Sequence, residues 1–239
     1  MREHYEERAH VQYAAPQPLP DPRLDRKFAR ISELVREHLP CNAFLDAGCG
    51  DGRYFRAFAG ELPERRSGVD ISERILETAR THDPGAELRQ ANLEQLPFAD
   101  GEFDLVLSTQ VIEHVLDPPL AARELARVLR PGGVLVISTD NARPRITQVL
   151  NVWRQLPVRI TRQSGRRSRV HSPAEPFTTE SFRELLAGAG LEVERIETFR
   201  FHLLWPLDRP ATQRSLNRLD ELLPDLGWGD IVAAVARKP

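Results

Sequence analysis

The chain has 239 residues, 41% of them hydrophobic and 28% charged, a composition that suits one ordinary globular domain with a sizeable core. Its formal net charge of -2 excludes a global electrostatic attraction to phosphates, so we expect no specific nucleic-acid partner. Two cysteines exclude a disulfide framework, and no segment approaches the ~18 apolar residues of a membrane span, which together favour a cytoplasmic protein.

The N-terminal segment is polar and rich in proline. Residues 1–23 carry Pro16, Pro18, Pro20 and Pro22, so we expect an extended arm or lid there. The start of the chain lacks the apolar run that an export signal would have, so we expect none. The remainder, residues 24–239, is predicted to form a single domain. It begins with a helix over Asp25–His38, in which apolar residues recur at helical spacing.

From residue 43 onward, short apolar runs alternate with amphipathic segments. The spacing predicts strands over 43–45, 67–69, 87–89, 103–107 and 134–137, and helices over 54–59, 73–80 and 120–129. The segment Arg130-Pro131-Gly132-Gly133 is predicted to break the last of these helices. A further helix over 178–189 and two strands, 191–198 and 231–236, follow after longer intervals.

This order of elements indicates an α/β fold. Strands that alternate with helices predict a Rossmann-like doubly wound sheet, mostly parallel, with helices on both faces. The last two strands are expected to add an antiparallel edge hairpin, which completes a seven-stranded sheet.

A glycine-rich turn, Asp46-Ala47-Gly48-Cys49-Gly50-Asp51-Gly52, follows the first predicted strand. The carboxyl end of a parallel strand is where open α/β folds bind ligands, and glycines there admit a nucleoside and permit positive φ. A dinucleotide turn would place its third glycine one residue later, and Asp46 and Asp51 would repel a pyrophosphate. The two carboxylates favour a sulfonium ligand that bears an ammonium group, S-adenosyl-L-methionine (SAM), over NAD.

Asp70 ends the second predicted strand, where a carboxylate can accept hydrogen bonds from both ribose hydroxyls of a bound nucleoside. A structural alternative is that Asp70 caps the following helix, for which Ser72 is the better-placed residue. The two roles can coexist.

Five segments in order resemble class I SAM-dependent methyltransferases of the type 11 group, to which ubiquinone-pathway O-methyltransferases are similar. They are FLDAGCGDG (44–52), GVDIS (68–72), LPFADGEFDLV (96–106), VIEHV (111–115) and LRPGGVL (129–135). The resemblance implies SAM as cofactor, bound by Asp46, Gly48, Cys49, Gly50, Gly52, Asp70, Ile71, Asn92, Leu93 and Thr109. Asn92 departs from the aspartate often found there, although its amide can still donate to and accept from a purine.

Two histidines are candidate general bases for an acceptor hydroxyl, His114 after the fourth strand and His171 before the predicted helix at 178. Alternatively, His114 only orients its loop and His171 is a hydrogen-bonded loop residue. Similar ubiquinone-pathway enzymes carry Glu-x-x-Glu-His as proposed ligands of a divalent cation. This chain has Gln110 at the first of those positions, and Mg²⁺ prefers carboxylates and water, so we expect no metal.

The segment 141–176 is predicted to be a lid-like insertion. It contains eight arginines and, up to Ala174, no acidic residue. Ile146, Val149, Leu150 and Trp153 share one helical face, as in a basic amphipathic helix. We hypothesise that the insertion selects an anionic or lipid-like acceptor and that residues 143–169 make peripheral membrane contact, the alternative being a solvated insertion.

The sequence therefore predicts an enzyme that methylates a small-molecule acceptor, with a hydroxyl oxygen as the expected target. Two alternatives stay open, a non-catalytic SAM-binding protein and a methyltransferase that acts on a macromolecule such as RNA or protein. The early third glycine and the lack of a separate substrate domain disfavour a dehydrogenase. Neither the identity of the acceptor nor the oligomeric state follows from the sequence.

Overall fold

The computed structural model describes residues 18–21, 25–142, 177–199 and 231–239 of the chain. His171, most of the N-terminal arm and nearly all of the arginine-rich insertion, including residues 143–169, lie outside these ranges. Within the described part of the chain, no helix has the length and apolar character required to cross a membrane.

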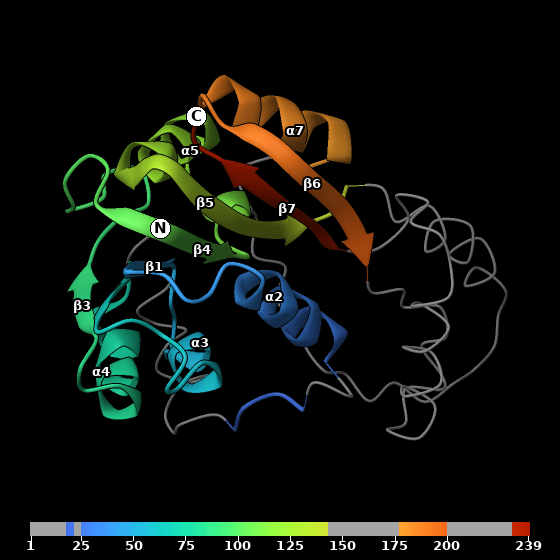
Figure 1. Cartoon of the computed structure of the whole chain (residues 1–239). Helices are drawn as coiled ribbons and strands as arrows, with labels where there is room; N and C mark the ends of the chain where they lie inside the picture. The colour runs from blue at the N-terminus through green and yellow to red at the C-terminus, as the bar shows by residue number, and fades with distance from the viewer. Residues whose placement is uncertain (1–17, 22–24, 143–176, 200–230) are drawn as a thin grey trace, which may run out of the picture.

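A seven-stranded sheet in the order β3-β2-β1-β4-β5-β7-β6 forms the centre of the molecule (Figure 1). The strands are β1 (Ala43–Ala47), β2 (Arg65–Asp70), β3 (Glu87–Gln90), β4 (Phe103–Thr109), β5 (Leu129–Asp140), β6 (Glu192–Phe199) and β7 (Ile231–Arg237). Neighbouring strands from β3 to β5 are parallel, and β7 is antiparallel to both β5 and β6. This order confirms the predicted doubly wound sheet with an antiparallel edge.

Helices cover both faces of the sheet. Helices α2 (Arg26–Arg36), α3 (Arg53–Ala57) and α4 (Glu73–His82) lie on one side, and α5 (Pro118–Val128) and α7 (Thr179–Gly188) on the other (Figure 1). Side chains alternate across each strand, so Phe44 packs into the α2 and α3 core while Leu45 packs into the α5 core. Nearly continuous apolar strands are what a sheet covered on both faces requires.

The predicted break after the helix at 120–129 is real, but the following strand begins earlier than expected. Helix α5 ends at Val128 and β5 starts at Leu129, five residues before the predicted Val134. The pairing with β4 shifts register between Phe103 and Leu105, and Gly132 has a φ of +75°. Residues 130–133 thus form an irregularity within the strand, which a search for an apolar run does not detect.

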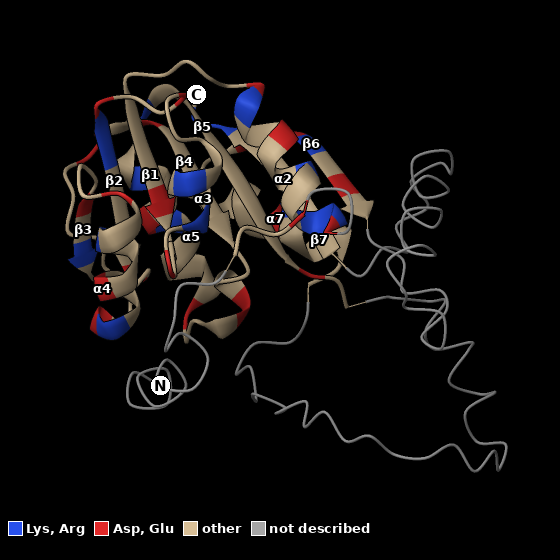
Figure 2. Cartoon of the chain, turned by 90° about the horizontal axis from the view of Figure 1, so that it is seen from below, with Lys and Arg blue, Asp and Glu red and all other residues tan. Residues whose placement is uncertain are grey.

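Charged residues are interspersed over the described helices and strands in the view of Figure 2. Several arginines pair with carboxylates, such as Arg30 with Glu197 and Arg66 with Asp83. In this view, Lys and Arg of the described residues are spread over several elements rather than gathered on one.

The described residues that flank segments 143–176 and 200–230 lie together at the edge of the sheet formed by the carboxyl ends of its parallel strands. Asp140, at the carboxyl end of β5, pairs with Ile231, which also pairs with Phe199. Asn141 forms a parallel bridge to Phe177, and Ala142 N donates to Phe177 O at 2.7 Å. This edge is also where β1 and β4 end, so the glycine turn opens toward the same side.

Candidate functional site

The glycine turn connects β1 to α3 in a left-handed backbone conformation. Gly48, Gly50 and Gly52 have φ values of +93°, +54° and +77°, a region in which residues with a Cβ are strained. Gly48 N and Cys49 N both donate to Val69 O, at 2.8 and 2.9 Å. The turn is thereby fixed to the carboxyl end of β2, with the Cys49 side chain buried beneath it.

The three glycines serve different steric purposes. A Cβ on Gly48 would lie 2.2 Å from Val111 Cγ2, and a Cβ on Gly52 would lie 3.1 Å from Ala79 Cβ. A Cβ on Gly50 would have nothing within 4 Å among the described atoms. Close packing within the protein therefore explains Gly48 and Gly52, whereas only its positive φ restricts Gly50 among the described residues.

Asp70 holds the turn from the adjacent strand. Its Oδ2 accepts from Gly50 N and its Oδ1 from Ser72 N, both at 3.0 Å. The cap of α4 is Ser72, whose Oγ accepts from Ile75 N, so the alternative that Asp70 caps this helix is wrong. That Asp70 also accepts hydrogen bonds from the ribose hydroxyls of a nucleoside stays a prediction.

Asp46 is a buried carboxyl group at the end of β1. It is fully buried, and neither of its oxygens has a hydrogen-bond partner among the described residues. Burial raises the pKa of Asp46 to about 8, the charge of Asp70 adds to the rise, and Arg53 partly opposes it. A buried carboxylate without a partner is costly, so the position fits the cationic end of SAM.

Asp51, the second carboxylate of the turn, has a protein partner. Its Oδ1 accepts from Arg53 Nε at 3.4 Å, and its side chain is 2% exposed. The charge argument for a cationic ligand therefore depends mainly on Asp46 rather than on both aspartates equally.

The pKa of Asp46 predicts that SAM affinity rises with pH up to about 8. Below that value the carboxyl holds a proton that must leave before it can pair with a cation, so Kd should increase up to about tenfold for each unit by which the pH falls. Calorimetric titration in two buffers of different ionisation enthalpy would measure the released proton. Asp46→Asn should bind without proton release, and a flat wild-type affinity between about pH 6 and 8 would contradict the assignment.

The same pKa shift has the opposite consequence for the ligand-free protein. The pKa of Asp46 rises from its ordinary 3.8 to about 8 on folding. The stabilisation that results from this raised pKa is complete at a pH below the pKa of Asp46 in the unfolded chain, and it is lost as the pH rises toward 8. Asp46→Asn should remove that part of the decline in melting temperature.

The segment expected to flank the adenine follows β3. Asn92 Nδ2 donates to Glu94 Oε2 at 2.7 Å, and Asn92 Oδ1 accepts from Glu94 N at 3.2 Å. Leu93 is buried in the core, and the Ile71 carbonyl accepts from Gln90 Nε2 at 2.9 Å. The Asn92 amide is thus directed to Glu94 and has one donor and one lone pair left for a purine.

Glu94 connects this segment to the loop after β4, a link that the sequence interpretation missed. Its Oε1 accepts from Leu116 N and Asp117 N at 2.6 and 2.7 Å. The carboxylate two residues after Asn92 was the available signal, but its partners lie more than 20 positions away along the chain.

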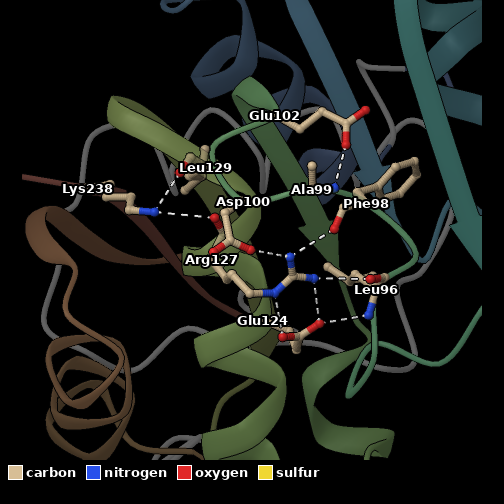
Figure 3. Close-up of polar contacts among 9 residues, drawn as sticks. All are labelled: Leu96, Phe98, Ala99, Asp100, Glu102, Glu124, Arg127, Leu129 and Lys238. Atoms are coloured by element: carbon tan, nitrogen blue, oxygen red, sulfur yellow. Dashed lines mark hydrogen bonds and ion pairs between the residues drawn. The ribbon is translucent and has the colours of Figure 1, made fainter.

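Arg127 of α5 fixes the remainder of the β3–β4 connection (Figure 3). Its guanidinium donates to the carbonyl oxygens of Leu96 and Phe98, at 3.1 and 2.8 Å, and pairs with Glu124 and Asp100. Glu124 in turn accepts from Leu96 N at 2.8 Å. A planar fork of donors suits such a set of oxygens, so the connection has little freedom relative to α5.

Replacing Arg127 with alanine is expected to lower the free energy of unfolding by about 2 kcal/mol, because several hydrogen bonds to a charged group are lost together. SAM affinity should fall several-fold, since the released connection carries Asn92. Thermal melting and SAM titration would measure both effects. Arg127→Lys keeps the charge without the fork and should recover only part of the stability, and wild-type values for Arg127→Ala would refute this role.

The loop after β4 carries the remaining predicted residues. A hydrogen bond joins the side chain of Thr109 to the hydroxyl of Tyr54, whose pKa is raised by burial. His114 lies half-buried in the short 3₁₀ helix η1 (Ile112–His114), and its N donates to Val111 O at 2.8 Å. The structure brings Thr109 and His114 to the edge that bears the glycine turn, while the catalytic role of His114 stays a prediction.

Glu113 is a buried carboxyl beside His114 that the sequence interpretation left without a role. Its Oε2 accepts from Thr139 Oγ1 at 2.9 Å, and burial is the main reason that its pKa rises to about 7. Among the described residues no three His, Cys, Asp or Glu side chains gather as a metal site. The expectation of metal-independent activity stays a prediction, which chelation and Mg²⁺ addition would test.

A family model described as a methyltransferase domain matches residues 45–137, which run from β1 into β5 and include the glycine turn. A probable S-adenosylmethionine-dependent methyltransferase of Mycolicibacterium smegmatis is 36% identical over 155 residues, 63% of this chain and 52% of that protein. A ubiquinone biosynthesis O-methyltransferase of Thiobacillus denitrificans is 28% identical over 190 residues, 77% of this chain and 79% of that protein.

The chain spans about half the length of the first curated relatives that it matches. Among solved structures, an S-adenosylmethionine dependent methyltransferase from Mesorhizobium loti has a TM-score of 0.63 at 22% identity, covering 90% of this chain and 98% of that one. At this level of identity the similarity concerns the fold, which agrees with the strand order described above.

Proposed function

We propose, from the premise that residues 45–137 are a methyltransferase domain of the class I SAM-dependent family, that the chain transfers a methyl group to a hydroxyl oxygen of a small-molecule acceptor. The observation that carries the proposal is the state of Asp46, a fully buried carboxyl whose oxygens have no partner among the described residues. It lies one strand away from Asp70 and directly before a turn that is open at Gly50.

Different residues at this edge would bind different parts of SAM. Asp46 would face the cationic methionine end, Asp70 the ribose hydroxyls, and Asn92 the purine. The turn itself is pre-organised by its bonds to Val69 O and Asp70, so binding need not fold it.

Bound SAM supplies an activated methyl group, so the protein has to orient the acceptor, exclude water and remove the hydroxyl proton. His114 is the group that we propose as the proton acceptor, because it is a half-buried imidazole in the loop that follows the carboxyl end of β4. His171 stays a second candidate from the sequence alone.

For the acceptor we propose an anionic or lipid-like molecule that carries at least one free hydroxyl. Support comes from the eight arginines between residues 141 and 174, from the bridge that attaches this segment at the carboxyl edge, and from the O-methyltransferase name of a relative. We further propose peripheral membrane contact through residues 143–169. Anionic liposomes should bind the wild type and lose binding when Arg154, Arg159 and Arg162 become glutamate.

The proposal is tested by incubating the protein with methyl-labelled SAM and cell extract and identifying the labelled product. Labelling of a small hydroxylated molecule is expected, and Asp70→Ala serves as the cofactor-binding control. If SAM binds and no molecule is labelled, the non-catalytic alternative gains support. Labelled protein or RNA would instead indicate a macromolecular acceptor.

A further inference from the structure

Gln110, the first residue after β4, has an unusual backbone conformation. Its φ of +56° is the only positive value of a non-glycine residue in the described part of the chain. Such a conformation strains a residue that bears a Cβ and persists only where the surroundings hold it. The Gln110 N donates to Ser138 O at 2.9 Å, so part of that hold comes from β5.

The side chain of Gln110 also stabilises this conformation, because it pairs with Asp140 at the end of β5. With the amide oriented by its partners, Nε2 donates to Asp140 Oδ1 at 2.9 Å and Oε1 accepts from Asp140 N at 3.2 Å. One donor and one acceptor meet their complements, a match that an amide provides and a carboxylate does not.

The loop that Gln110 begins is held at two further points. Glu113 accepts from Thr139, the neighbour of Asp140, and Val111 lies so close to Gly48 that a Cβ there would be 2.2 Å from it. The loop 110–114 therefore lies between the glycine turn and the end of β5 and contacts both. Directly beyond Asp140, Asn141 and Ala142 pair with Phe177.

We infer that Gln110 is a positioning residue whose pairing with Asp140 sets the loop 110–114 against the glycine turn and places His114 at the site. The inference rests on the proposed function for its effect on methyl transfer, but its effect on SAM affinity does not depend on the acceptor. It also gives a reason for glutamine at position 110 that involves no metal. A glutamate at position 110 would bring its carboxylate close to that of Asp140, and it would lack the amide N–H that donates to Asp140 Oδ1.

The test is a charge exchange between positions 110 and 140, with Gln110→Glu, Asp140→Asn and the double variant. At about pH 8, Gln110→Glu should weaken SAM binding and methyl transfer by roughly five- to tenfold, because one hydrogen bond is lost and a second carboxylate then faces the exposed Asp140. The double variant restores one donor opposite one carboxylate and should return both quantities to within about threefold of wild type.

A pH profile separates this role from a general loss of stability, provided that each variant is measured well below its melting temperature. The ratio of Gln110→Glu to wild-type SAM affinity should recover as the pH falls and one of the two carboxyls binds a proton. Glu113, whose pKa responds to Asp140 and to Lys27 of α2, is present in both proteins, so its own titration largely cancels in the ratio.

Three outcomes would overturn the inference: unchanged SAM affinity in Gln110→Glu, no rescue by Asp140→Asn, or a new dependence of Gln110→Glu on Mg²⁺. If Gln110→Glu does not fold, the double variant must fold and bind SAM, because its pair is matched. If the wild type binds SAM but methylates nothing, the proposed function fails, while the affinity ratio still decides the role of Gln110.

Discussion

Gly50→Ala is expected to weaken SAM binding at least about a hundredfold while the protein stays folded. The new methyl group would have no atom of the described residues within 4 Å, so the expected cost to folding is the left-handed conformation, roughly 1–2 kcal/mol. The same methyl group would lie on the turn between Asp46 and Asp70, where we propose that the cofactor binds. Isothermal titration with SAM and thermal melting would measure the two effects separately.

The chain offers a matched control in Gly60, which has a φ of +82° and where an added Cβ would also have no described atom within 4 Å. It lies beyond α3, away from the turn, so Gly60→Ala should cost similar stability and leave SAM affinity unchanged. Gly48→Ala should behave differently and lose roughly 3 kcal/mol or more, since its Cβ would clash with Val111. Equal SAM affinities for Gly50→Ala and Gly60→Ala would show that the ligand does not approach Gly50.

Asp70→Ala is expected to raise the Kd for SAM by about 100- to 1000-fold. The substitution removes the proposed ribose contacts and also the acceptor for Gly50 N, and hydrogen bonds to a charged group contribute about 1.5–3 kcal/mol each. Equilibrium dialysis with labelled SAM would measure the change. Asp70→Asn keeps the shape of the side chain and one carbonyl oxygen, so its Kd for SAM should lie between those of the wild type and Asp70→Ala.

The control for Asp70 is Ser72→Ala, two residues away. Loss of this helix cap should lower stability by about 1 kcal/mol and leave the Kd for SAM within about threefold of wild type. If Ser72→Ala weakened SAM binding as much as Asp70→Ala, the order of α4 rather than a carboxylate contact would control the site.

The fold was predictable because its signals are local. Apolar runs such as Phe44-Leu45 and the alternation of strands with helices depend on neighbours within one element, and all seven predicted strands are present. The start of β5 was placed too late because Arg130 to Gly133 contains a proline and two glycines. These residues normally end a strand, but here the sheet accommodates them through a shift in register.

The candidate site was predictable only in part. Asp46, Asp70 and the glycines follow from spacing, because each lies at the end of a strand or in the turn after it. Glu94, Arg127 and Gln110 could not be predicted, because each acts through partners from a distant part of the chain. A distinction such as that between Gly48 and Gly50 also requires the folded structure, since sequence alone does not reveal which Cβ would meet Val111.

The bridge between Asn141 and Phe177 has a consequence for how such a protein can change. Because the two ends of the intervening segment meet at one point of the sheet, the segment can be lengthened, shortened or exchanged at a small entropic cost, about 0.6 kcal/mol per doubling of length. The glycine turn, Asp70 and the Arg127 contacts lie outside that closure. If this segment selects the acceptor, as we propose, a change of acceptor requires changes in this one segment only, and the residues that we propose to bind SAM can stay the same.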